Sequence, residues 1–189
     1  TGVSGAVSLA NSLVGTTASD KVGGGGVTAL SNGNYVVRSH EWDNGGAADA
    51  GAVTWGNGTT GVSGAVSLAN SLVGTTANDR VGIGYVTALS NGNYVVGSPL
   101  WDNGGAADAS AVTWGSGTTG VSGAVSLANS LVGSTAGDYV GNGGVIELSN
   151  GNYVVGSPLW DNGGATNAGA VTWGSGTTGI SGAVSLANS

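Results

Sequence analysis

A repeat of 59 residues is the sequence feature that most constrains the fold of this chain. The segment TGVSGAVSLANS begins at Thr1, Thr60 and Thr119, and it returns at Thr178 with a single substitution, Ile180. No insertion or deletion interrupts the period, and the first two copies differ at only 9 of 59 positions. Such near-identical tandem copies predict identical structural units, each of which buries its apolar surface against its neighbours.

Short β segments bounded by Gly and Asn fill each copy. Residues 27–30, 35–37 and 52–55 are rich in β-branched and aromatic residues, and residues 64–68 supply a fourth segment. The pair Asn32-Gly33 lies between the first two segments and predicts a tight type I′ hairpin. No stretch shows the apolar period of a helix. The sequence therefore predicts an all-β chain of tandem four-stranded antiparallel β-propeller blades, with a β-solenoid as the alternative; the hairpin favours blades because solenoid coils run parallel.

The blade interpretation divides the chain into four parts. Residues 1–15 form an outer strand left from a preceding repeat, with its β segment at residues 5–9. The three blades then occupy residues 16–72, 73–131 and 132–189. Three blades are fewer than the roughly four to eight that close a propeller. We therefore expect a longer array, or self-association through the end blades into a ring or a fibre.

Composition excludes several function classes. The chain has no Cys, one His, three Lys plus Arg and a net charge of -7. Without Cys there are no disulfides, no thiol catalysis and no Cys-based metal sites. With three basic residues, nucleic acids and anionic membranes are poor partners. We expect a protein that is not an enzyme, needs no cofactor and does not insert into membranes.

Acidic residues recur in two Gly-rich loops. Asp43 and Asp49 lie six residues apart and could share a calcium ion, but a solvated turn in which they bond to the local backbone is the favoured interpretation. A second position, before each Val-Gly pair, is predicted to cap a turn between blades. The later members of the first group are Asp102, Asp108 and Asp161, with Asn167 in place of an aspartate, and the capping group is Asp20, Asp79 and Asp138.

Six tryptophans occupy two positions of the repeat. Trp55, Trp114 and Trp173 share a strand face with valines and are predicted to lie in the core. Trp42, Trp101 and Trp160 each precede an Asp-Asn pair, which fits either a contact between blades or a platform for a sugar.

The pair His40-Glu41 could act as a general base. The other two copies carry Pro-Leu at this place, and no nucleophile accompanies the pair. We therefore do not expect catalysis there.

Residues 72–99, LVGTTANDRVGIGYVTALSNGNYVVGSP, resemble the FG-GAP repeat of integrin alpha-chain β-propellers. Val81-Gly82 stands in place of Phe-Gly, 97–99 in place of Gly-Ala-Pro, and 111–114 in place of Gly-Ala-Val plus an aromatic residue. The sequence of the copies is also similar to long repeat arrays in giant secreted bacterial adhesins of the haemagglutinin type. The resemblance implies a structural or adhesive module, secreted or at the cell surface. It implies the chain itself as a partner, or a glycan or protein on another surface in a lectin-like alternative.

The resemblance also raises the question of calcium. FG-GAP blades often bind calcium in a carboxylate-rich loop between the first two strands. Here that loop is Ser-Asn-Gly-Asn at residues 31–34, 90–93 and 149–152, without a carboxylate. Calcium prefers six to eight oxygen ligands with negative charge among them, so we expect this loop to be a plain turn.

Overall fold

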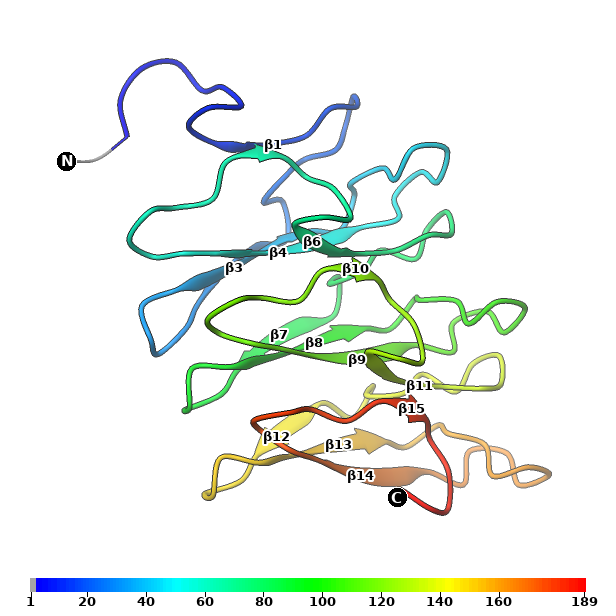
Figure 1. Cartoon of the computed structure of the whole chain (residues 1–189). Helices are drawn as coiled ribbons and strands as arrows, with labels where there is room; N and C mark the ends of the chain where they lie inside the picture. Colours follow the sequence, from blue (N-terminus) through cyan, green and yellow to red (C-terminus); the bar gives the residue numbers. More distant parts are fainter. Residues whose placement is uncertain (1–2) are drawn as a thin grey trace.

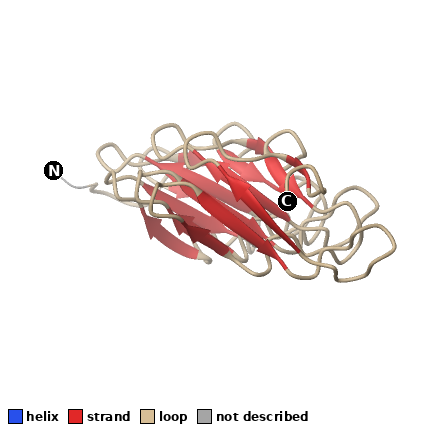
Figure 2. Cartoon of the chain, turned by 90° about the horizontal axis from the view of Figure 1, so that it is seen from below, coloured by secondary structure: helices blue, strands red, loops and turns tan. Residues whose placement is uncertain are grey.

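The computed structural model describes residues 3–189, and every regular element in them is a β-strand. The sheets lie one above another in chain order, with the termini at opposite ends of the stack (Figure 1). Seen along the stack, strands of successive levels overlie one another and loops surround them (Figure 2). The chain is thus an all-β array of tandem blade-like units, as predicted, and none of its sheets closes into a barrel.

Three antiparallel strands of one copy form the body of each level. In the first level these are β2 (Gly26–Ala29), β3 (Tyr35–Ser39) and β4 (Ala52–Gly56). These strands match the predicted segments at residues 27–30, 35–37 and 52–55 to within two residues. The equivalent strands are β7 (Tyr85–Ala88), β8 (Tyr94–Ser98) and β9 (Ala111–Gly115) in the second level, and β12 (Val145–Glu147), β13 (Tyr153–Ser157) and β14 (Ala170–Gly174) in the third.

In the first two levels the fourth strand comes from the next copy and differs from the prediction, whereas the third level has three strands. β6 (Ser71–Val73) pairs antiparallel with β4, and β10 (Gly123–Ala124), from the copy after that, adds parallel to β6. The predicted strand at residues 64–68 is wrong in extent and in partner, because only β5 (Gly64–Ala65) forms, and it pairs with β1 (Leu13–Val14). The second level repeats the arrangement with β11 (Ser130–Val132) and β15 (Gly182–Ala183).

The strand predicted at residues 5–9 does not form. In the later copies the equivalent Gly-Ala pair becomes a strand only by pairing with a Leu-Val pair of the copy before it, as Gly64 does with Leu13. No such Leu-Val pair precedes residues 5–9 in the described chain, and a two-residue strand has too few hydrogen bonds to form alone.

The hairpin between β2 and β3 was predicted correctly, but its turn type was not. Of the central pair, Gly33 has a positive φ of 86° and Asn32 does not, so the turn is not type I′. Leu30 N donates to Asn34 O, which closes a longer loop around the turn. The Asn32 side chain closes this turn as well, because its Oδ1 accepts from Asn34 N at 3.0 Å.

Apolar side chains pack between levels rather than within one. Val36 and Val53 of the first level and Val96 of the second belong to one fully buried cluster. Gly82, with a φ of 82°, lets the levels approach closely, because a Cβ there would lie 2.4 Å from Val53 Cγ2. The core is therefore the surface between successive repeats.

Candidate functional site

Equivalent backbone hydrogen bonds join the first level to the second and the second level to the third. At the first seam, between the levels of β2–β4 and β7–β9, Gly74 N donates to Gly51 O at 3.1 Å and Val81 N to Ala50 O at 3.0 Å. At the second seam, between β7–β9 and β12–β14, the equivalent bonds run from Gly133 to Ser110 at 3.2 Å and from Val140 to Ala109 at 3.3 Å.

A single carbonyl oxygen in each following level receives three side-chain donors. The Gly117 oxygen accepts from Asn32 Nδ2 at 2.8 Å, Asn34 Nδ2 at 2.8 Å and Trp55 Nε1 at 3.0 Å. A side chain at Gly117 would collide with Gly92 O, so this carbonyl needs glycine beside it. The second seam repeats the set, with Asn91, Asn93 and Trp114 donating to Gly176 O. The two asparagines of the Ser-Asn-Gly-Asn turn thus hold the next repeat by hydrogen bonds to one carbonyl oxygen, which we call the carbonyl clamp. This turn is the one compared above with a calcium loop.

One cross-strand pair fills the seam differently in the first two copies. In the first level Arg38 lies opposite Gly26, and Arg38 Nη1 donates to Gly82 O at 3.3 Å. In the second level the large residue is on the other strand: Tyr85 lies opposite Gly97.

The Tyr85 hydroxyl donates to Gly141 O at 3.0 Å, and Gly141 is the equivalent of Gly82. A Cβ on Gly97 would lie 2.5 Å from the Tyr85 ring, so only one large residue fits the pair. Sequence reasoning missed this coupling. The sequence feature that indicates it is a double difference between the first two copies: Gly26 and Arg38 in the first are replaced by Tyr85 and Gly97 in the second.

The aspartates at the second loop position also reach across the seams. Asp49 Oδ2 accepts from Arg80 Nη2 at 3.1 Å, and Asp108 Oδ2 accepts from the Tyr139 hydroxyl at 3.2 Å. The Asp108 carboxylate raises the pKa of Tyr139 by repelling the negative charge of the ionised phenol. Asp49 and Asp108 therefore pair with side chains of the next copy.

The remaining loop aspartates accept hydrogen bonds from backbone N–H groups. Asp79 is fully buried; its Oδ2 accepts from Thr75 and Thr76 and its Oδ1 accepts from Asp102, at 2.8, 2.8 and 3.1 Å. Asp102 Oδ1 in turn accepts from Asp108 N at 2.9 Å. Burial raises the pKa of Asp79 despite these bonds. Equivalent bonds are made by Asp20, Asp138, Asp43 and Asp161.

The carboxylates do not gather into a metal site in residues 3–189. No three acidic or histidine side chains in that part of the chain are grouped as metal ligands. The pairs considered for calcium, Asp43 with Asp49 and Asp102 with Asp108, are instead linked through the backbone N–H of the second residue.

The tryptophans considered as a sugar platform are buried. Trp42, Trp101 and Trp160 are only 5%, 5% and 6% exposed. They pack in buried apolar clusters, as Trp42 does with Ala52 and Val73 of the first five-stranded sheet. An exposed ring face is what a sugar needs, so this burial agrees with packing and contradicts the platform interpretation.

His40 and Glu41 form a surface ion-pair group with Lys21. Lys21 Nζ lies 2.6 Å from Glu41 Oε2, and His40 Nε2 lies 3.6 Å from Glu41 Oε1. The hydrogen bond from Lys21 lowers the pKa of Glu41. A carboxylate held in its ionised form by lysine is a weak base, and exposed ion pairs of this kind contribute little to stability.

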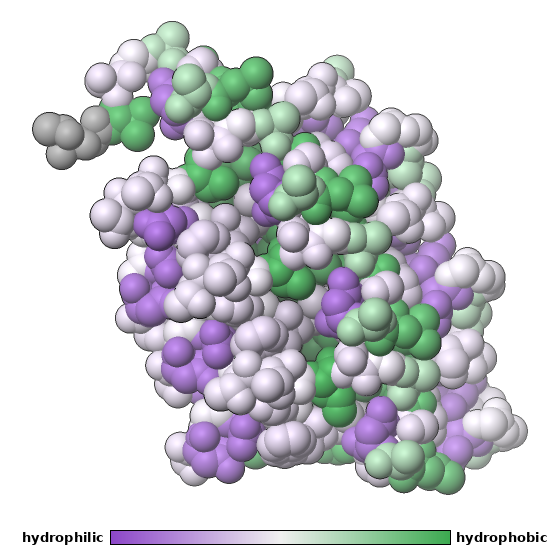
Figure 3. All heavy atoms as spheres, in the orientation of Figure 1, coloured by the Kyte–Doolittle hydropathy of each residue, from purple (hydrophilic) through white to green (hydrophobic). Residues whose placement is uncertain are grey.

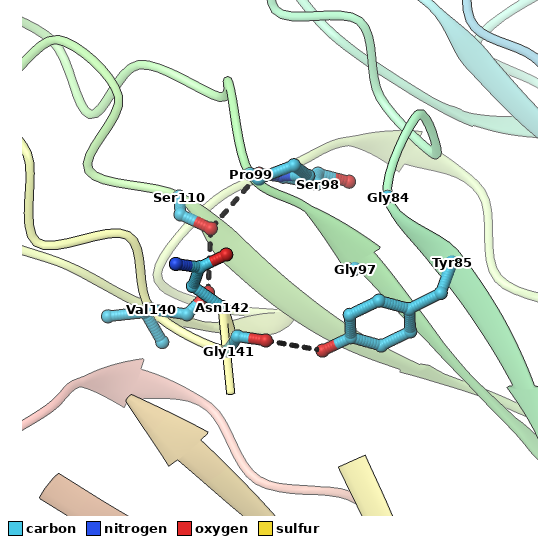
Figure 4. A pocket seen from close by; sticks show the side chains of 9 residues that line it. All are labelled: Gly84, Tyr85, Gly97, Ser98, Pro99, Ser110, Val140, Gly141 and Asn142. Carbon is cyan, nitrogen blue, oxygen red and sulfur yellow. Dashed lines mark hydrogen bonds between the residues drawn. The ribbon is translucent and has the colours of Figure 1, made fainter. Parts of the chain in front are cut away.

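A small cavity lies in the second seam (Figure 4). Its volume is about 90 Å³, and Tyr85, Pro99 and Asn142 are among the residues that line it. Ser110 Oγ bridges the two levels beside it, with Ser98 O at 3.2 Å and Val140 O at 2.7 Å. Ordinary small-molecule sites are roughly 300–1,000 Å³, so this cavity is a packing gap.

In the described residues, no helix is long and apolar enough to cross a membrane.

Comparison with known proteins matches the repeats of the chain to a family of repeats. Comparison with curated proteins gave no match. A family model described as a repeat of unknown function (DUF5650) matches residues 1–24, 29–83, 88–142 and 147–189. These segments cover most of the sequence, and each complete match runs from the first hairpin of one level to the Val-Gly loop of the next. The chain therefore belongs to this family of repeats of unknown function.

Proposed function

We propose that the chain is a non-enzymatic structural repeat module, whose repeats stack into an open rod that spaces or supports other parts of an assembly. The observation that carries this proposal is the repetition of the seam. The same carbonyl clamp and the same backbone bonds join the first level to the second and the second to the third. A contact that repeats in one direction without closing extends into a filament.

The chemistry of the side chains fits a structural role. The loop aspartates bond to backbone N–H groups, and the amides of Asn32 and Asn91 bind the next repeat. These groups are occupied in holding the stack together. The FG-GAP resemblance supports a place for such a rod in a secreted or cell-surface bacterial protein with an adhesive role.

Arrays of different length test the proposal. The 189-residue chain and variants with one or two further exact copies of residues 60–118 would be compared by small-angle X-ray scattering. An open rod predicts a maximum dimension that grows by a constant amount per copy and an unchanged cross-section. A maximum dimension that stays constant would contradict the rod.

A further inference from the structure

A row of leucines lies exposed along one side of the stack. Leu68 and Leu127 are 46% and 48% exposed, and Leu9 and Leu186 occupy the equivalent places in the first and last copies. Apolar patches recur at successive levels on the face that Figure 3 shows. Around each of the two inner leucines, the described chain contains the equivalent turn of the copy before and of the copy after. Neighbouring repeats are thus present and leave these leucines uncovered, so their exposure is a property of the repeat itself.

The turn that carries each leucine directs its polar groups inward. Asn129 Oδ1 accepts from Ser126 N at 2.9 Å, and Asn129 Nδ2 donates to Ala124 O at 2.9 Å. Asn70 makes the same two bonds in the copy before. The amide is therefore occupied inside the turn, and the apolar Leu127 remains at its tip. Because these bonds fix the turn, little conformational freedom is lost when the leucine is covered.

A groove borders the leucine row between two successive copies. It measures about 320 Å³ and is lined by Trp114, by Val121 and Ala128 of one copy and by Ile180 of the next, among others. Ala128 directly follows Leu127 in the chain. The tip of the turn and the groove therefore lie next to one another on the same side of the stack.

The same lining is present at the first seam. Trp55, Val62 and Ala69 are the equivalents of the first three lining residues. Each is buried to the same degree as its counterpart, the first two partly buried and Ala69 exposed. At this seam the chain continues on both sides of the groove, so the groove belongs to every pair of successive copies.

The segments that form this side of the stack are uncharged. Residues 60–74, 119–133 and 178–189 contain no Asp, Glu, Lys, Arg or His, although the whole chain has a net charge of -7. Like-charged chains therefore meet the least repulsion along these segments. We call the surface made by the leucine row and the grooves beside it the leucine strip.

We propose that the leucine strip of one chain binds the leucine strip of a second copy side by side, with each leucine seated in a groove of the other chain. The strip carries both the projecting side chain and the groove, and both recur once per repeat. A second copy therefore presents leucines at the same spacing as the grooves. A surface that is complementary to itself satisfies the condition for a twofold contact, which closes at two chains.

The pairing goes beyond the proposed function, because a rod can space or support other parts without it. Each repeat adds one leucine and one groove to the contact. Contacts on one rigid rod form together, so their affinities multiply. Arrays with two further copies of residues 60–118 should therefore pair at a lower concentration than the 189-residue chain.

Sedimentation velocity over a concentration series of the 189-residue chain tests the pairing. Leu127→Asp places a charge in the middle of the strip and should raise the dissociation constant at least about tenfold, because an apolar side chain is no longer buried and a charge is desolvated instead. Ala128→Asp tests the groove in the same way, because Ala128 is exposed and lines it. Ala107→Asp is the matched control. It adds the same charge at an exposed alanine outside the strip, where the third copy carries Thr166, and should leave the dissociation constant unchanged.

A monomer–dimer equilibrium that weakens in Leu127→Asp and Ala128→Asp and is kept in Ala107→Asp supports the pairing. A chain that is monomeric at every concentration overturns it. Association that continues past the dimer, that Leu127→Asp or Ala128→Asp leaves unchanged, or that Ala107→Asp weakens equally also overturns it. Circular dichroism confirms that each variant is folded. Scattering from arrays of these variants tests the rod separately, so the pairing can fail while the proposed function stands.

Discussion

Tyr85 lies directly opposite Gly97 on neighbouring antiparallel strands, and its hydroxyl reaches Gly141 O of the next repeat at 3.0 Å. One level earlier the pair is reversed: Arg38 supplies the large side chain opposite Gly26 and reaches the equivalent carbonyl oxygen of Gly82. The two differences between the first two copies, Gly26 to Tyr85 and Arg38 to Gly97, are thus coupled, because the two residues lie opposite one another on paired strands.

Gly97→Arg is expected to destabilise the chain by about 1–3 kcal/mol, the usual range for an overpacked site. The new side chain would compete with Tyr85, whose ring lies 2.5 Å from a Cβ at that position. Urea denaturation measures the change in the free energy of unfolding.

The double variant Tyr85→Gly/Gly97→Arg recreates the pair of the first copy and should recover most of that loss. Gly97→Arg alone matching the parent chain, or a double variant less stable than the single one, would show that the two positions are not coupled.

Asp79→Ala should cost about 3 kcal/mol or more, because it leaves three backbone N–H groups in a buried turn without their acceptor. Thermal or urea denaturation gives the value. Asp108→Asn is the matched control and should change stability by less than about 1 kcal/mol, since the third copy carries Asn167 at this place. Equal losses in both variants would refute the capping role.

The strands that lie within one copy could be predicted from the sequence, and those shared between copies could not. The segment around Tyr35 is β-branched, is bounded by an Asn-Gly turn and pairs with its chain neighbours, so local pattern suffices. Ser71–Val73 is only three residues long and pairs with β4 of the copy before and β10 of the copy after. Its strand character comes from contacts far apart in the sequence.

The roles of the candidate site residues could also be predicted only where they depend on nearby residues in the chain. A capping role for Asp79 follows from its place before a turn. The burial of Trp42 does not, because it depends on a turn in which Trp42 N donates to Ser39 O and on the contacts of the ring with Ala52 and Val73. The clamp on Gly117 O was missed because its donors lie 62 to 85 residues away in the chain.

Tyrosine ionisation should limit stability at alkaline pH. Burial raises the pKa of Tyr85 to about 12 and that of Tyr153 to about 12, against about 10 in an unfolded chain. Between these values the folded chain binds more protons than the unfolded one. The stabilisation is therefore complete below about pH 10 and is lost as pH rises through about 12.

Denaturation at a series of pH values, with tyrosinate absorbance followed in parallel, checks this expectation. Tyr85→Phe should flatten the decline above pH 10. Ionisation of all five tyrosines near pH 10 with the fold intact would be the opposite of what burial predicts.

Removal of divalent ions should leave the melting temperature unchanged. The loop carboxylates accept backbone hydrogen bonds, as Asp43 does from Asp49 N, and no group of three acidic or histidine ligands occurs in residues 3–189. Differential scanning calorimetry with and without a chelator makes the comparison. A drop of more than about 5 °C, on the order of 1 kcal/mol for a small domain, would reveal a bound metal.

The levels stack in one direction (Figure 1), and their sheets do not close on one another. Spin labels on cysteines at Thr59, Thr118 and Thr177 test it most directly, because these residues are exposed equivalents in successive copies and the chain has no cysteine of its own. Pulsed electron paramagnetic resonance would give the distances for the 59/118, 118/177 and 59/177 pairs. An open stack predicts equal distances for the first two pairs and a 59/177 distance close to their sum. A 59/177 distance no longer than the other two would mean that the three levels close on themselves, and it would contradict the stack.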